Sequence, residues 1–263
     1  GLSALVSAIL LLGTLGRTGG RFSASDGFSI ATLGWLVLAL LAAVPLYLCK
    51  AAGAEGGASP AASFSFSGAL VETISGLTTT GATVFGTDAS VVGGRGVIEA
   101  LPPSFLFMRS LCHWLGGMGI IVLSLAVLPM LGMGGMALFK AEIPGPVPEK
   151  LTPRVQHSAL LLWGIYVLFT AAQTGALLAG GLSFFDALTH TFGTVATGGF
   201  SPLNQSVGQY HSPYVEWVIT LFMFLSGASF ALHYRFLRGD GSAHWRDPEF
   251  CLYSGITVGA TAL

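Results

Sequence analysis

Two short stretches rich in threonine and glycine carry the residue types that could coordinate a dehydrated cation. The first is Glu72–Thr83 and the second is His190–Ser201, and the two align when the chain is shifted by 118 residues. Threonine hydroxyls and backbone carbonyls can replace the hydration shell of a monovalent cation. Glycine allows the backbone angles that turn successive carbonyls toward one axis. The two stretches therefore predict a cation-binding loop that occurs twice.

The alignment also covers the short apolar segments that precede the two stretches. An internal repeat is sought first because it determines the architecture. Each copy has the same order: a long apolar segment, a short half-apolar segment, a Thr/Gly turn and a second long apolar segment. This order is typical of a pore loop between two membrane helices. The identical pairs in this register are Ser65/Ser183, Phe66/Phe184, Ala69/Ala187, Leu70/Leu188, Thr73/Thr191, Thr79/Thr197 and Gly81/Gly199.

The composition indicates a membrane protein. Hydrophobic residues make up 52% of the chain and charged residues only 9%, whereas a soluble domain carries about 25% charged residues. The net charge of -1 gives no indication of nucleic-acid binding. The three cysteines, Cys49, Cys112 and Cys251, lack metal or disulfide spacing and are interpreted as small buried hydrophobes.

The expected fold class is an all-α membrane protein built from helix–pore-loop–helix units. The first repeat covers residues 30–131 and the second covers residues 157–238, with a cytoplasmic connector at 132–156. The apolar runs at residues 1–16 and 250–263 are interpreted as truncated membrane helices.

Within each repeat, two long apolar runs are expected to span the membrane, because a span needs about 20 residues. The short segments Phe64–Leu77 and Ser183–Val195 are predicted to be re-entrant helices that enter the membrane without crossing it. The predicted spans are Ile30–Leu48, Phe105–Leu131, His157–Leu178 and Val215–Phe236.

The distribution of basic residues predicts the orientation of these segments. If the connectors lie on one side of the membrane, that side holds eight of the 11 Lys and Arg residues, and the positive-inside rule makes it cytoplasmic. The pore loops are then external. The eight residues are Arg17, Arg21, Lys140, Lys150, Arg154, Arg235, Arg238 and Arg246.

Three motifs together resemble one family. They are Leu77–Phe85, with the sequence LTTTGATVF, Arg109–Ile121, which contains WLGGMG, and Thr197–Ser201, with the sequence TGGFS. They resemble the Trk/Ktr/HKT potassium-uptake superfamily, and are most similar to the TrkH-type membrane subunits of bacteria. The resemblance implies four repeats around one pore, preceded by an extra helix pair. This chain would then be the N-terminal half, with two of the four repeats. The resemblance also implies that residues 1–16 are the end of the extra N-terminal membrane helix and that residues 250–263 are the truncated start of the third repeat.

The resemblance also implies which residues bind the ion. The family's selectivity-filter glycine falls on Gly81, and by register on Gly199; glycine rather than serine at the first position favours K⁺ over Na⁺. K⁺ is the transported ion, and we expect no cofactor, catalytic residue or transition-metal site. The expected filter residues are Thr79, Thr80, Gly81, Ala82, Thr197, Gly198, Gly199 and Phe200.

The implied function is K⁺ uptake across the bacterial inner membrane by the ion-translocating subunit of a Trk-type system. The implied partners are a cytoplasmic nucleotide-binding regulatory subunit of the TrkA type and a second copy of the chain. Three alternatives remain: a secondary H⁺- or Na⁺-coupled cation symporter, a two-repeat cation channel that dimerises, and helix-capping turns in a packed bundle. An intramembrane enzyme is disfavoured because the loops lack a nucleophile and base at helical spacing.

Other polar and small residues near the loops are expected to have structural roles. We predict that Gly116, Gly117 and Gly119 allow close helix packing. Arg109 and His113 are expected to reach the membrane interface from the outer end of their helix. Glu72 is expected to support its short helix through hydrogen bonds, with a contribution to the cation field as the alternative.

Overall fold

All regular secondary structure in the described part of the chain is helical. The structure is a computed structural model that describes residues 24–53, 65–85, 98–127 and 152–261, and these contain no strand. The segment predicted at residues 1–16, and residues 132–151 of the predicted connector, lie outside the described residues. The elements are α2 (Ala24–Gly53), α3 (Phe66–Leu77), α4 (Pro103–Val127), α6 (Thr152–Ala179), α7 (Phe184–Val195), the 3₁₀ helix η4 (Ser206–Tyr210), α8 (Pro213–Ser226), α9 (Phe230–Leu237), α10 (Ala243–Arg246) and α11 (Pro248–Thr261).

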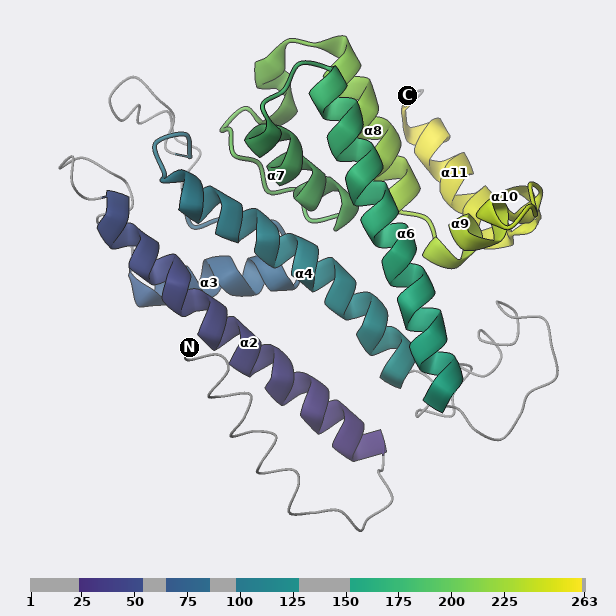
Figure 1. The fold of residues 1–263 in the computed structure, drawn as a ribbon, viewed down its shortest axis with the longest axis horizontal. Helices are drawn as coiled ribbons and strands as arrows, with labels where there is room; N and C mark the ends of the chain where they lie inside the picture. Colours follow the sequence, from purple (N-terminus) through teal and green to yellow (C-terminus); the bar gives the residue numbers. More distant parts are fainter. Residues whose placement is uncertain (1–23, 54–64, 86–97, 128–151, 262–263) are drawn as a thin grey trace.

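The helices form two groups that meet at α4. Helices α2, α3 and α4 lie together on one side of the molecule, and α6, α7 and α8 lie together on the other (Figure 1). Helix α4 contacts α2 and α3 in its own group and α6 and α7 in the other group. Each group therefore contains one short helix, α3 or α7, packed among longer ones.

The two short helices begin and end at corresponding residues. Ser65 and Ser183 are the N-caps, and each side chain accepts a hydrogen bond from the backbone N–H three residues later, as serine does at this position. Each helix has 12 residues and ends at Leu77 or Val195, 118 residues apart. The two predicted short helices are therefore present, and their re-entry into the membrane remains a prediction.

The segment predicted to span the membrane at Val215–Phe236 consists of two helices with a bend between them. Helix α8 ends at Ser226, α9 begins at Phe230, and their axes differ by 99°. The break contains Gly227 and Ser229, which have lower helix propensity than the apolar residues around them. The carbonyl of Leu225, next to the break, accepts a hydrogen bond of 2.8 Å from His233 Nε2. This bond compensates for part of the interrupted helical hydrogen bonding.

Among the described helices, one is long and apolar enough to cross a membrane. It is the segment Ala159–Ala179 of α6, and the bent α8–α9 pair would be a second if it counts as one span. The α6 segment agrees with the predicted span over His157–Leu178. Another apolar segment, Thr32–Leu48 of α2, is shorter.

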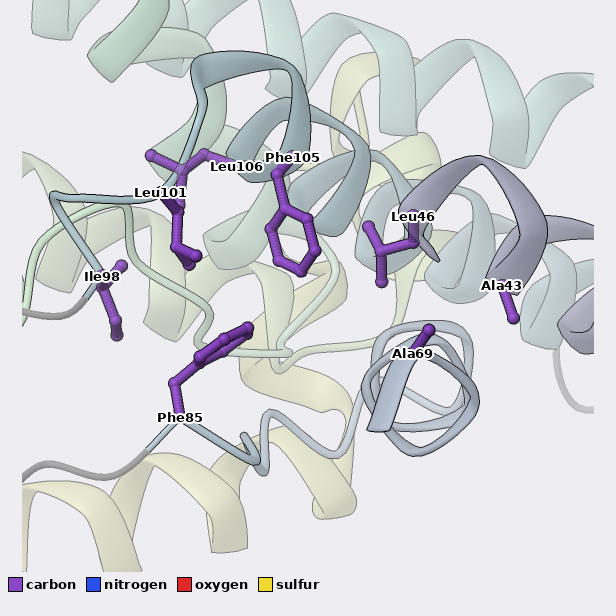
Figure 2. Close-up of a cluster of buried hydrophobic side chains, with 8 residues drawn as sticks. All are labelled: Ala43, Leu46, Ala69, Phe85, Ile98, Leu101, Phe105 and Leu106. Carbon is purple, nitrogen blue, oxygen red and sulfur yellow. The ribbon is translucent and has the colours of Figure 1, made fainter. Parts of the chain in front are cut away.

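A buried apolar cluster fixes the chain that follows the first Thr/Gly loop. The ring of Phe85 lies edge-on to the ring of Phe105 in α4, with centroids 5.5 Å apart, and Figure 2 shows the two rings next to each other in this arrangement. Ala43 and Leu46 of α2 and Ala69 of α3 complete one side of the cluster. The remaining members are Ile98, Leu101 and Leu106.

Candidate functional site

Two loops with the same backbone pattern follow the short helices. We call Thr78–Phe85 loop A and Ala196–Ser201 loop B. In loop A, φ is positive at Thr79 (52°) and Gly81 (76°), and in loop B it is positive at Thr197 (55°) and Gly199 (87°). A positive φ is strained for a β-branched residue such as threonine. Such strain persists where the surrounding structure enforces it, often at functional sites.

The first N–H groups of each loop donate hydrogen bonds to the end of the preceding short helix. In both loops the first backbone N–H groups donate to carbonyls of the preceding helix: Thr79 to Gly76, Thr80 to Ser75, Thr197 to Thr194 and Gly198 to Gly193, at 2.9–3.0 Å. These bonds close the C-terminal ends of the two helices. Among the described residues, no hydrogen bond reaches the carbonyl oxygens of Thr79, Thr80, Gly81, Thr197, Gly198 or Gly199.

The two loops touch each other through their backbones. A Cβ added to Gly81 would overlap the carbonyl oxygen of Gly198. No other residue type fits at Gly81 without moving one of the loops, because φ is also positive there. The carbonyls of both loops therefore belong to one site.

Two consecutive glycines of α4 bring the ends of both short helices to this site. A Cβ on Gly116 would overlap the carbonyl oxygen of Leu77, which is the last residue of α3. A Cβ on Gly117 would lie 3.0 Å from the Cα of Ala196, which directly follows α7. The predicted packing role of these glycines is confirmed. Helix C-terminal ends carry partial negative charge, so two such ends converge at the loops and favour a cation there.

The expected filter residues differ in their exposure. The side chains of Thr80, Ala82 and Thr197, and residue Gly199, are exposed, whereas Thr79, Gly81 and Gly198 are half-buried. A Cβ on Gly199 would meet no atom within 4 Å, so loop B is open on that side. Phe200 is buried and contacts α4.

Glu72 and Arg109 form a buried ion pair next to the loops. Arg109 Nε donates to Glu72 Oε1, and the two residues are 3% and 1% exposed. The expectation that Arg109 and His113 reach the membrane interface is wrong, since His113 is fully buried. The reason is that Glu72 supplies an internal partner for the guanidinium. The expected hydrogen-bonding role of Glu72 is confirmed.

Arg109 and His113 of α4 both contact Phe200 in loop B. The Arg109 guanidinium lies 3.7 Å from the centroid of the Phe200 ring, and the His113 ring stacks on the same ring with centroids 4.0 Å apart. Arg109 Nη1 also donates to the carbonyl of Ser201 at 3.0 Å. This link was not among the contacts predicted from the sequence. A signal existed, since an arginine and a glutamate within apolar segments are expected to be paired.

Comparison with known proteins assigns the chain to a family. A family model described as TrkH, a cation transport protein, matches residues 5–245. The chain belongs to the TrkH family. The resemblance found in the sequence is confirmed, and the fold is that of an all-α membrane protein from a family of transporters, not of enzymes.

Individual TrkH proteins show how much of the chain is shared. It is 41% identical over 244 residues to the Trk system potassium uptake protein TrkH of Salmonella typhimurium, covering 92% of this chain and 46% of the relative. It is 44% identical over 226 residues to the protein of the same name from Halomonas elongata. This match covers 85% of this chain and 43% of the relative. The crystal structure of the potassium transporter TrkH from Vibrio parahaemolyticus has a TM-score of 0.70 and 34% identity, covering 92% of this chain and 45% of that one. The chain thus spans about half the length of these relatives.

Proposed function

We propose that loops A and B form part of a K⁺ selectivity filter and that the protein takes up K⁺ as the ion-translocating subunit of a Trk-type system. One observation carries this proposal: the two loops have the same strained backbone, touch each other, and present unpaired carbonyls at two helix C-terminal ends. The names of the relatives, potassium uptake proteins, support the choice of ion.

The ion would be coordinated mainly by backbone oxygen. Uncharged carbonyls suit a monovalent cation that must bind and then leave. The carbonyl of Ala82 accepts a hydrogen bond from Ser75 Oγ, and the Phe200 side chain packs against α4, so these two residues would close the ion-binding segments. The segments themselves would be Thr79–Gly81 and 197–199.

Two loops provide too few oxygens to surround the ion, and we propose that two further loops complete the filter. The chain covers 46% of the Salmonella relative, which leaves length for a second pair of repeats. The open side of loop B at Gly199 is where another loop could approach. In this arrangement residues 30–131 and 157–238 are repeats one and two, and α11 belongs to the start of repeat three.

The proposed location is the bacterial inner membrane, with the loops external and the connectors cytoplasmic. The residues that support this orientation are basic: Arg235 lies in α9 and Arg238 follows it, in the segment that leads to α10. The connectors would then be the face for a nucleotide-binding regulatory subunit of the TrkA type, and the complete protein would be a homodimer.

The test is Gly81→Ser in the full-length protein, expressed in a bacterium that lacks other K⁺ uptake. Serine would be strained at this φ and would push Gly198 away. We expect K⁺ over Na⁺ selectivity to fall roughly tenfold, which corresponds to about 1.4 kcal/mol. Gly164→Ser in α6 is the control, because a Cβ there meets nothing within 4 Å. Unchanged relative uptake of the two ions in Gly81→Ser would refute the filter assignment.

A further inference from the structure

The buried pair of Glu72 and Arg109 connects loop A to loop B. We propose that these two residues are positioning residues that set the distance between the loops, and thereby determine how well the filter discriminates K⁺ from Na⁺. The inference rests on the proposed function, because it assigns to this pair the geometry of the proposed filter. The two residues come from different helices, α3 and α4.

Glu72 holds the end of loop A. Its Oε1 accepts a hydrogen bond of 2.9 Å from Thr83 Oγ1, and its Oε2 accepts one of 3.0 Å from the backbone N–H of Val84. Both carboxylate oxygens are therefore used, and the carboxylate cannot rotate without breaking a bond. Thr83 lies two residues after Gly81, so the fixed point is close to the proposed ion-binding segment.

Arg109 holds the corresponding point of loop B. Its Nε donates to Glu72 and its Nη1 donates to the carbonyl of Ser201, the residue aligned with Thr83. The planar guanidinium also covers the ring of Phe200. Because the guanidinium is rigid, with donors in a fixed arrangement, the two bonds determine how far Ser201 lies from Glu72.

The first repeat alone has this charged pair. Residue Glu72 aligns with His190 in the second repeat. Helices α4 and α8 both begin at a proline, and counted from it Arg109 corresponds to Ile219 and His113 to Met223. Ile219 and Met223 line a cavity of about 360 Å³ beside loop B. Loop B is thus held by the charged side chain of Arg109, and it also lines a cavity together with apolar residues of α8.

The cost of burying these charges indicates that the pair has a specific role. Apolar residues of similar volume often stabilise a buried site as well as an ion pair does, and the equivalent positions of α8 are apolar. Ionisable residues inside a membrane protein are expensive and are functional candidates with a defined partner. What an ion pair adds over apolar packing is fixed geometry. Fixed distances between coordinating oxygens are what an ion filter requires.

The experiment uses the full-length protein and measures K⁺ and Na⁺ uptake per amount of folded protein in the membrane. Arg109→Met and Glu72→Gln are expected to lower K⁺ over Na⁺ selectivity about fivefold to tenfold, in the range typical of coupling between sites. Arg109→Lys is expected to be intermediate, because an ammonium keeps the charge and lacks the planar arrangement of donors. The double variant should lose no more selectivity than the stronger single variant, because the two residues act as one unit.

A matched control separates positioning from general destabilisation. Arg235 pairs with Asp240 at the surface, far from the loops in sequence and in a different helix, so Arg235→Met should leave selectivity unchanged. A purely structural role of the Glu72–Arg109 pair would reduce the amount of folded protein and leave the ratio of K⁺ to Na⁺ uptake unchanged. If Arg109→Met does not accumulate, the isosteric Glu72→Gln decides the question.

The outcomes also separate this inference from the proposed function. Unchanged selectivity in folded Glu72→Gln, with reduced selectivity in Gly81→Ser, would overturn the positioning role and leave the filter assignment standing. Unchanged selectivity in both variants would refute the filter assignment itself. Reduced selectivity in both, with the control unchanged, supports the positioning role.

Discussion

Loops A and B have the same backbone conformation and are held by different parts of the protein. Loop A is held by its own short helix: Ser75 donates to the carbonyl of Ala82, and Glu72 accepts from Thr83. In α7, the helix before loop B, Gly193 aligns with Ser75 and His190 aligns with Glu72. Among the described contacts, neither residue makes a side-chain hydrogen bond to loop B. Loop B is held instead by α4, which belongs to the other group of helices.

The difference shows which features a repeated loop needs in both copies. Glycine at the second positive-φ position and the hydrogen bonds to the helix end are common to both loops, because they determine the backbone itself. The supporting side chains differ between the copies: Ser75 and Glu72 hold loop A, whereas Arg109 and His113 of α4 contact loop B. We infer that loop A is largely self-supporting, whereas loop B depends on the first repeat.

The largest effect is expected from giving loop B the supporting residue of loop A. In Gly193→Ser, the new Cβ would lie 2.7 Å from the carbonyl oxygen of Phe200, and such overpacking costs about 1–3 kcal/mol. Ser75→Ala should cost only about 1 kcal/mol, for one lost hydrogen bond. The measurement is thermal unfolding of the purified full-length protein. A Gly193→Ser variant that is more stable than the wild type would mean that the two loops are interchangeable.

A smaller effect is expected at the second positive-φ glycine. Gly199→Ser places a side chain at φ 87°, which costs about 1–2 kcal/mol, and no atom lies within 4 Å to oppose it. Gly81→Ser has the same kind of strain and also overlaps Gly198. We therefore expect Na⁺ uptake relative to K⁺ uptake to rise less in Gly199→Ser than in Gly81→Ser. The reverse order would contradict the assignment of loop A as the more constrained loop.

The smallest effect is expected for an ion pair outside both loops. The pKa of Asp240 lies below its ordinary value of 3.8 because Arg235 and Ser242 donate hydrogen bonds to its carboxylate. The pKa of Asp240 is lower in the folded protein than in the unfolded chain. The stability that the Arg235–Asp240 pair contributes is therefore complete above pH 3.8, and it disappears as the pH falls through the pKa of the folded state. Asp240→Asn should leave the melting temperature at pH 7 nearly unchanged, because exposed pairs contribute little. A clearly lower melting temperature of Asp240→Asn at pH 7 would indicate that the Arg235–Asp240 pair stabilises the protein more than its exposure implies.

Sequence reasoning predicted the repeated features of the site and missed those that occur once. The repeat predicted the two short helices to within two residues, as Phe64–Leu77 and Ser183–Val195, and the position of the loops that follow them, because these features depend on the local residue types. The roles of Gly116 and Gly117 followed from their small size. The bend after Ser226 was missed because α8 and α9 together are long and apolar enough to be one span. The eight expected filter residues, and their role in ion binding, remain predictions.

The sequence by itself determined the all-helical architecture, the two short helices with their caps, and the glycines that allow the loop backbone. These depend on interactions within a few residues, which residue types specify directly. The tertiary structure alone decided that Arg109 lies buried between the loops, that Phe200 packs on α4, and that Gly81 touches Gly198. These contacts join residues 37 to 117 positions apart, so they exist only once the two groups of helices have packed against each other.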